Sequence, residues 1–380
     1  MDFKLSKEHL MTRNAARDFC KKEIAPLIGE GEEEGKFPKQ LMPKMGELGF
    51  LGAGFPEKYG GLGADKITEC LFVDEVHQVS AGVGGAVLVQ LGLGKFPILK
   101  YGSEEQKEKY LKPAILGEKI ASFSLTESDA GSDAASIQAT AVREGDSYVL
   151  NGTKIFITNG PICDYTIFVG YTDPSKRGAG INLFIVEDGT PGFTKGQKLD
   201  KVGLKICETS EMVFDNCRVP ASAIIGSEDQ GGFEQLEETL RWGRIVYGAR
   251  CAGLGQAIYD MTVDYVKNRV AFGRPIIKNQ VVKFRLAEMA MYIDIIRTIT
   301  YKAAWLHEQG LPCAKEASYV KLFSTEAAQK IADTGMQLHG GAGYMMETPI
   351  QRFWRDARAF TITEGTSEIQ HMVIAKELGL

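Results

Sequence analysis

The chain has 380 residues, more than a single hydrophobic core usually holds, so two or three packed units are expected. Its 44 % hydrophobic and 24 % charged residues are typical of a globular protein, and a net charge of −5 offers no basic surface for nucleic acid. The N-terminal segment is charged and amphipathic, and no apolar run of about 18 residues occurs, so we expect a cytoplasmic protein without membrane insertion.

Cysteine and histidine residues are scattered along the chain. None of the seven cysteines is spaced as CxxC, and the five histidines form no HExxH pair. A disulfide framework and a metal site are therefore not expected. We interpret the cysteines as small buried hydrophobes in a reducing compartment.

Residues 1–118 are predicted to form an N-terminal helical domain. Apolar residues recur at helical spacing over residues 11–19 and 41–48, and again over about 67–78 and 82–94. Glycine and proline residues interrupt the pattern between these stretches, which is typical of short connections between helices.

Residues 119–228 are predicted to form a middle β domain. The stretch SYVLNGTKIFIT (147–158) contains two β-rich runs joined by Asn151-Gly152, which predicts a hairpin. Further short strands are expected over residues 165–171, 181–187 and 211–214. Closely spaced strands of this kind favour a compact β-sandwich or barrel.

Residues 229–380 return to the helical period. Long patterned stretches over residues 257–266, 281–300 and 318–338 predict an antiparallel four-helix bundle. The predicted fold class is therefore α+β multi-domain: a helical domain, a central β-sandwich or barrel, and a C-terminal bundle.

No common nucleotide or hydrolase motif is complete in the sequence: GxGxxG, GxxxxGK[ST] and GxSxG are all missing. Four other stretches allow both a binding role and a plain structural one. FSLTESDAGSD (123–133) suits contact with phosphate or ring heteroatoms, or is a polar interdomain turn. FITNG (156–160) suits a binding role and a plain strand terminus equally well. NRVAFGRP (268–275) suits pyrophosphate and adenine, or is a solvated helix end. QLHGGAGY (337–344) ends a helix in glycines that allow close approach of a ligand or of backbone.

TITEGTSEIQ (361–370) raises the same question for Glu364. Ser367 and Gln370 fit a capping box, so a helix is predicted to begin there. A carboxylate just before a helix commonly serves the positive end of the helix dipole. The local sequence allows that role and the role of a base.

Taken together, the motifs resemble those of the acyl-CoA dehydrogenase family over almost the whole chain. The stretches that carry the resemblance are PEKYGGLG (56–63), YGSEEQKEKYL (101–111), TESDAGSD (126–133), NGTKIFITNG (151–160), NRVAFGRPI (268–276), QLHGGAGY (337–344), RDAR (355–358) and EGTSEIQ (364–370).

The resemblance implies that FAD lies between the β domain and the C-terminal bundle, without a Rossmann fold. The residues implied around the isoalloxazine ring are Phe123, Leu125, Thr126, Phe156 and Thr158, with Gly131 and Ser132 near the pyrophosphate and CoA. The residues implied to reach the FAD of a neighbouring subunit are Arg269, Phe272, Gln280, Gln337 and Gly341. Thr366 and Gln370 complete the implied cofactor site.

The resemblance places Glu364 at the position of the catalytic base. Some relatives carry the base on an earlier helix, just before an arginine, but that position here is Gly243, before Arg244. Glu364 is therefore the only candidate for removing the α proton of an acyl-CoA thioester while the β hydride passes to FAD.

The same resemblance gives a substrate site with two departures from the family pattern. The implied substrate residues are Ser132, Arg244, Leu91, Trp242, Thr363 and Gly365. The first departure is Thr363, which stands where the family frequently has tyrosine. The second is the stretch LRWGR (240–244), which ends in Arg244, whereas the family commonly has Asp or Asn before this arginine. The indole of Trp242 would shorten the acyl pocket, and the small Thr363 would widen it. Together they predict a short, branched or alicyclic acyl group.

Three functions follow as alternatives. The first is an FAD-dependent acyl-CoA dehydrogenase that passes electrons to an electron-transfer flavoprotein and assembles as a homotetramer, a dimer of dimers. The second is an oxygen-using flavin oxidase or monooxygenase on the same fold. The third is a non-catalytic scaffold homologue.

Overall fold

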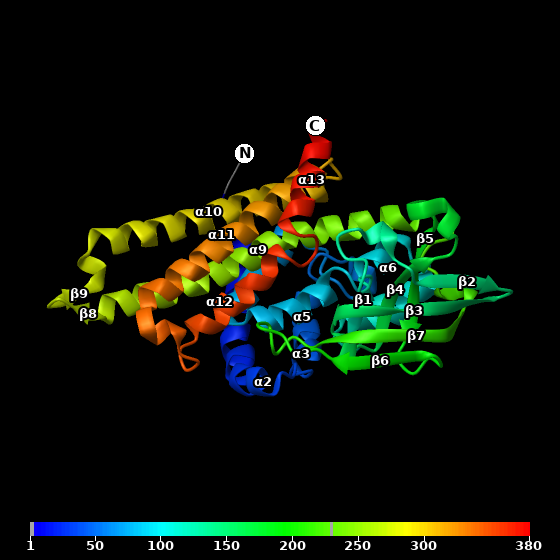
Figure 1. Ribbon diagram of the computed structural model, residues 1–380, viewed down its shortest axis with the longest axis horizontal. Coiled ribbons are helices and arrows are strands. Elements are labelled where there is room, and N and C mark those ends of the chain that lie inside the picture. Colours follow the sequence, from blue (N-terminus) through cyan, green and yellow to red (C-terminus); the bar gives the residue numbers. More distant parts are fainter. Residues whose placement is uncertain (1–3, 229–230) are drawn as a thin grey trace.

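The computed structural model describes residues 4–228 and 231–380. It is elongated: long helices run along its length and a sheet lies at one end, with the chain's first helices packed underneath (Figure 1). The predicted fold class is confirmed: along the chain, a helical region is followed by a β region and then by a second helical region.

The N-terminal region is helical, as predicted. Its helices are α1 Lys7–Phe19, α2 Ile28–Glu34, α3 Leu41–Glu47, α4 Lys66–Val79, α5 Ala81–Leu91, α6 Phe96–Tyr101, α7 Glu104–Gln106 and α8 Lys112–Ile115. Asp65 caps α4 by accepting a hydrogen bond from the Thr68 N–H at 2.8 Å, and Ser80 caps α5 in the same way. In the described residues, the stretch Ala81–Tyr101 is long and apolar enough to cross a membrane, but 89 % of its apolar window is buried inside the protein. Its hydrophobicity is that of a core helix.

The middle region contains the strands of one sheet. They are β1 Ala121–Ser124, β2 Thr140–Glu144, β3 Ser147–Thr158, β4 Tyr165–Tyr171, β5 Ile181–Glu187, β6 Phe193–Lys198 and β7 Thr209–Pro220. The hydrogen-bonded order is β1-β4-β2-β3-β7-β6, and β5 pairs with β4. The predicted strands over residues 165–171 and 181–187 are confirmed residue for residue.

The sheet folds over on itself, as a sandwich or barrel requires. Phe168 on β4 and Phe214 on β7 lie far apart in the strand order, yet their ring centroids are 4.5 Å apart. Phe193 on β6 stacks on Phe214 at 4.9 Å. These rings form the centre of a core enclosed by the curled sheet.

The hairpin predicted at Asn151-Gly152 is wrong. β3 runs through both residues, and the tight turn lies earlier, between β2 and β3 at residues 145–146. Gly152 instead sits at a register shift opposite β7, with φ +146°, and a Cβ there would lie 2.6 Å from the Cβ of Ala139. Glycine is thus required by a bulge and by close packing, not by a turn.

The C-terminal region is a bundle of long helices. Its elements are α9 Gly232–Asn268, β8 Val270–Ala271, β9 Arg274–Pro275, α10 Gln280–Glu308, α11 Ala314–His339, α12 Ile350–Arg358 and α13 Ser367–Glu377. α9, α10 and α11 pack side by side, and α12 and α13 pack on α11 (Figure 1). α4 also packs on α9, so the two helical regions share one hydrophobic core.

Candidate active site

Glu364 lies in the connection between α12 and α13, in an unusual backbone conformation. Its φ is +55°, and Gly365 follows with φ +91°. A left-handed conformation is uncommon outside glycine and is kept only where the surroundings enforce it. The N-cap of α13 is Thr366, which accepts a hydrogen bond from the Ile369 N–H at 3.4 Å, one residue before the predicted cap Ser367.

One oxygen of the Glu364 carboxylate is held away from water without a hydrogen bond. Its Oε2 is buried and has no hydrogen-bond partner among the described residues, although the residue as a whole is partly exposed. Burial raises the pKa of Glu364, and three nearby cations, Arg250, Lys321 and Arg244, oppose that rise. A desolvated carboxylate kept ionisable by neighbouring charge is suited to act as a general base.

Gly243 on α9 makes room for this carboxylate. A Cβ at position 243 would lie 2.4 Å from Glu364 Oε2 and 3.9 Å from Leu93. Any side chain at 243 would therefore compete with the Glu364 carboxylate for the same space. The two positions considered for a base thus meet at one point in the structure.

Both sides of the Glu364 loop are fastened to buried side chains. On one side, Lys321 Nζ donates to the Gly365 carbonyl at 2.7 Å, and Gln370 Nε2 donates to the same oxygen at 3.0 Å. On the other, Thr363 Oγ1 shares a hydrogen bond with the hydroxyl of Tyr247. Arg250 Nη1 donates to that tyrosine oxygen at 3.0 Å.

Sequence reasoning missed three of these residues: Lys321, Tyr247 and Arg250. All three are buried within long helices, with Lys321 on α11 and the others on α9. A signal existed for Lys321, because it falls four residues after Ala317 and four before Thr325, on the buried face of its helix.

The predicted flavin residues of the β domain come together at adjacent strand ends. Thr126 accepts a backbone hydrogen bond from Ile155 at 2.8 Å, which joins the 123–133 loop to the end of β3. Lys154, fully buried, supports this loop by donating to the Leu125 carbonyl at 2.9 Å and by pairing with Glu127 at 2.8 Å.

The connection between α5 and α6 links the β domain to the surroundings of Glu364. A Cβ at Gly94 would lie 2.3 Å from Ala121 on β1, and the neighbouring Leu93 faces Gly243. Tyr165 on β4 donates to the Gly94 carbonyl at 3.0 Å. Glu364 therefore lies where α9, this connection and the β domain meet.

The other predicted cofactor and substrate residues differ in their exposure to solvent. Gly131 and Ser132 are exposed in the 123–133 loop, Thr363 is exposed, and Arg244 and Gly365 are partly buried beside Glu364. The buried Nε of Arg244 has no hydrogen-bond partner among the described residues, and burial lowers the pKa of this guanidinium.

Trp242 and Leu91, expected to line the acyl pocket, are both buried among the helices. Trp242 is 1 % exposed, with the Lys66 ammonium 4.6 Å from its ring centroid and the His307 ring at 5.1 Å. Leu91 is also buried in the helical core. The reason is helical geometry: Gly243 faces Glu364, so its neighbour Trp242 is rotated by about 100° into the interhelical core.

The residues predicted for a neighbouring subunit lie at the far end of the bundle from the sheet (Figure 1). Arg269, Phe272, Gln280, Gln337 and Gly341 are all exposed there, and Phe272 is 101 % exposed. The stacked rings of Tyr265 and His339 hold the ends of α9 and α11 together at this place.

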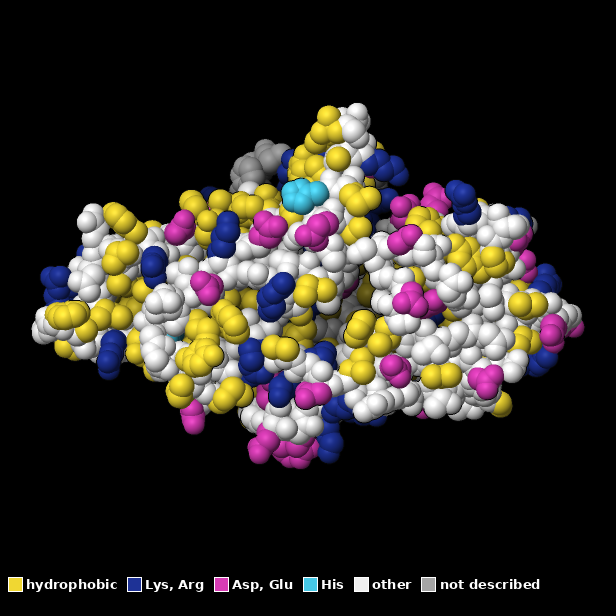
Figure 2. Space-filling view, in the orientation of Figure 1, with side chains coloured by type: hydrophobic (Ala, Val, Ile, Leu, Met, Phe, Trp, Pro, Cys, Tyr) yellow, Lys and Arg dark blue, Asp and Glu magenta, His cyan; other side chains and the backbone are white. Residues whose placement is uncertain are grey.

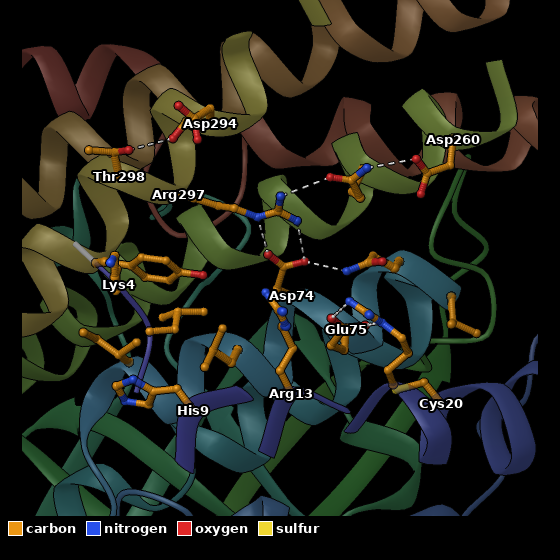
Figure 3. Close-up of a pocket in the computed structure, with 18 of the residues that line it drawn as sticks. Lys4, His9, Arg13, Cys20, Asp74, Glu75, Asp260, Asp294, Arg297 and Thr298 are labelled. Carbon is orange, nitrogen blue, oxygen red and sulfur yellow. Dashed lines mark hydrogen bonds and ion pairs between the residues drawn. The ribbon is translucent and has the colours of Figure 1, made fainter. Parts of the chain in front are cut away.

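A large cavity lies elsewhere and does not contain Glu364. Its volume is about 1480 Å³, and it is lined by residues of α1, α4, α9 and α10. Arg297 reaches across it to Asp74 at 2.9 Å, and Arg17 pairs with Glu75 (Figure 3). Opposite charges already pair with one another here, and Glu364 is not among the residues that line this cavity.

Comparison with known families matches most of the chain in three successive segments. Residues 6–118 match the acyl-CoA dehydrogenase N-terminal domain, residues 122–217 the middle domain, and residues 230–379 the C-terminal domain. The chain belongs to the acyl-CoA dehydrogenase family.

Similar acyl-CoA dehydrogenases cover the chain nearly end to end. An acyl-CoA dehydrogenase of Bacillus subtilis (strain 168) is 44 % identical, with 98 % of each chain covered. The mitochondrial short-chain specific acyl-CoA dehydrogenase of Homo sapiens is 41 % identical, covering 98 % of this chain and 90 % of its own. A 3-(aryl)acrylate reductase of Clostridium sporogenes is 42 % identical, with 98 % and 99 % covered.

Solved structures agree with this fold over its full length. Butyryl-CoA dehydrogenase from Megasphaera elsdenii superposes with a TM-score of 0.97 at 40 % identity, covering 100 % of both chains. A chain from the work on the electron transferring flavoprotein of Acidaminococcus fermentans gives 0.97 at 39 %, covering 100 % and 99 %. The FAD complex of PigA gives 0.96 at 31 %, covering 100 % of both.

Acyl-CoA dehydrogenases are flavoproteins, and the residues of this chain fit a flavin. Phe156 stands on a β-bulge with φ +61° and is 65 % exposed, so its ring is free to stack on a planar group. Gln370 is fully buried, and its Oε1 has no hydrogen-bond partner among the described residues. An exposed ring and a buried, unpaired acceptor are what a bound flavin would cover and satisfy.

Proposed function

We propose that this acyl-CoA dehydrogenase oxidises the α,β bond of an acyl-CoA thioester, with Glu364 as the base and FAD as the cofactor. The observation that carries the proposal is the buried, unpaired Oε2 of Glu364, which lies against Gly243 with three cations nearby. Bound FAD would supply the acceptor for the hydride that leaves the β carbon.

The chain's own residues perform the proton transfer. Glu364 takes the α proton, and the desolvation that raises its pKa increases its basicity in the ionised form. The nearby cations Arg250, Lys321 and Arg244 oppose that rise in pKa and so favour the ionised form. Oε2 of Glu364 is buried against α9 at Gly243, with Leu93 nearby, so this oxygen is shielded from water.

Glu364→Gln tests this assignment, since the change is nearly isosteric and removes the base. The loss of a general base is typically worth about 10²–10⁴-fold in rate. Flavin bleaching by substrate under anaerobic conditions measures the rate, and retained flavin absorbance shows that the cofactor site is intact. The exposed acid four residues later, mutated as Glu368→Gln, is the matched control. A Glu364→Gln enzyme that bleaches as fast as the control contradicts the proposal.

FAD binding is proposed to need a second copy of the chain. Gly243, beside the base, and Arg269, at the far end, are 26 residues apart along the continuous helix α9, a span of about 39 Å. Arg269 and Phe272 of one chain therefore lie far from that chain's own Glu364, and their exposure leaves them available to a neighbour's cofactor. We include Gln280, Gln337 and Gly341 in the same contact.

The proposed assembly is a homotetramer built as a dimer of dimers. Hydrophobic side chains are exposed over the helical half of the molecule (Figure 2), and α10 contributes Val281, Phe284, Met291 and Ile295 to this surface. Sedimentation of wild type and Arg269→Ala, with FAD content measured in each fraction, tests the link between cofactor and assembly. A monomer that retains all of its FAD contradicts it.

For the substrate, we propose a short-chain acyl-CoA. Support comes from the similar enzymes named for short-chain substrates and for butyryl-CoA. The indole of Trp242 was expected to limit the length of the acyl pocket. It gives no support to the proposal of a short-chain substrate, because it is buried in the bundle. Comparing kcat/KM for butyryl-CoA, a branched thioester, an alicyclic thioester and a long straight-chain one tests the proposal. An optimum with the long chain contradicts it.

The proposed electron acceptor is an electron-transfer flavoprotein in the cytoplasm, which accords with the match to a chain from the Acidaminococcus fermentans work. Rapid reoxidation of the substrate-reduced enzyme by air alone would instead favour an oxygen-using enzyme.

A further inference from the structure

We propose that Lys321 is a positioning residue for the base: its buried ammonium holds the Glu364–Gly365 backbone and favours the ionised carboxylate of Glu364. The inference deepens the proposed function and rests on Glu364 as the base.

The first support is the hydrogen bond to the loop. Lys321 on α11 is 0 % exposed, and its Nζ donates to the Gly365 carbonyl at 2.7 Å. Gln370 Nε2 donates to the same oxygen at 3.0 Å, so both lone pairs of that carbonyl are used. This carbonyl belongs to the residue directly after Glu364, whose φ of +55° is disfavoured for a residue with a side chain. Two buried donors on one carbonyl are a direct means of keeping that conformation.

The second support is the charge around Lys321. The titratable groups that act on it are Glu364, Glu368, Arg244, Arg250 and the neutral Cys251 thiol, and the centre of the Tyr247 ring lies 5.5 Å from its Nζ. Burial lowers the pKa of Lys321 to about 8, and Glu364 is the strongest opposing influence. Lys321 forms no salt bridge within 4.0 Å among the described residues, and Glu364, which acts on it through space, is its main source of favourable charge.

The third support is the cost of placing a lysine here. Burial of an ammonium is unfavourable, and a neutral side chain of similar length such as methionine could occupy the same helical position. Arg250 and Tyr247 already fasten the Thr363 side of the loop. Lys321 is the only charged donor among the described residues that fastens the Gly365 side.

Two substitutions separate the roles of the charge and of the hydrogen bond. Lys321→Met removes both, and Lys321→Gln removes the charge while keeping an N–H donor. The control is Lys330→Met, on the same helix but exposed. Circular dichroism and FAD content of each variant establish that the fold is retained.

The first measurement is an infrared titration of the Glu364 carboxyl in flavin-free protein, with the spectrum of the matching Glu364→Gln variant subtracted. Removing a nearby positive charge should raise the Glu364 midpoint by about 1 pH unit in both Lys321 variants, and leave it unchanged in Lys330→Met. The acid limb of kcat/KM should move to higher pH by the same amount, because that profile reports the free enzyme.

The second measurement is hydrogen exchange of the segment 361–370, which should quicken in Lys321→Met relative to Lys330→Met. A Glu364 midpoint that stays at the wild-type value in both Lys321 variants, with unchanged exchange, overturns the inference. The proposed function has its own test, and it is contradicted if the Glu364→Gln variant remains active. The infrared titration still reports on the coupling of Lys321 and Glu364 in that case, since it needs no turnover.

Discussion

Gly243→Ala is the sharpest test of the active-site geometry, because it should raise stability while reducing activity. Gly243 lies inside α9, where alanine is favoured over glycine by about 1 kcal/mol. The added Cβ would lie 2.4 Å from Glu364 Oε2, whereas ordinary contact begins at 3.4 Å. The carboxylate must therefore move by the difference, about 1 Å, and it can do so because it is the end of a flexible side chain.

A misplacement of about 1 Å in a reacting group can cost about 10²-fold in rate. We therefore expect kcat/KM to fall about 100-fold, equivalent to about 2.7 kcal/mol of transition-state stabilisation. Thermal unfolding of the same preparations should show an equal or higher Tm. An additional Glu364→Asp change, one methylene shorter, should relieve the clash and recover part of the lost rate.

Gly255→Ala on the same helix is the control. Its Cβ would meet only the ends of Ile331 and Ile293, at 3.1 and 3.3 Å, far from the base. Activity should stay at the wild-type value in this variant. Wild-type kcat/KM in Gly243→Ala would refute the placement of the Glu364 carboxylate against α9.

Two further predictions concern stability. Arg297→Met should destabilise the fold by about 3–5 kcal/mol in urea unfolding, because it leaves the buried Asp74 carboxylate unpaired, and adding Asp74→Leu should recover much of that loss. Burial raises the pKa of Asp356 to about 7, above that of the unfolded chain, so its contribution is fully present in acid and is lost as the pH rises through that value. Asp356→Asn should therefore flatten the decline of stability between about pH 4 and 7, where one such group accounts for about 1.4 kcal/mol per pH unit; an equally steep decline in the variant would contradict this.

The predictions that the structure confirmed depend on local pattern. β4 and β5 are buried along almost their whole length, so their continuous apolar runs marked both strands correctly. Helices α4, α10 and α11 were predicted from the sequence because one face of each is apolar at helical spacing. The order of helical, β and helical regions follows from these runs alone.

The wrong predictions arose where a distant segment changed the meaning of a local signal. Asn151-Gly152 has the composition of a turn, but Ala139 and β7 make it a bulge inside a strand. Trp242 stands one residue from Gly243 in the chain, yet it faces Lys66 and His307 from other helices. Such neighbours are far away in sequence, so no local spacing encodes them.

The sequence by itself predicted most of the elements, the family motifs and Glu364 as the candidate for the base. Only the tertiary structure decided that Glu364 lies against Gly243, and that Lys321 and Arg250, from helices α11 and α9, anchor the loop on either side of it. The reason is physical. Periodicity depends on which face of a helix or strand is buried, whereas the pKa and orientation of a carboxylate depend on charges and atoms a few ångströms away, brought there by chain folding.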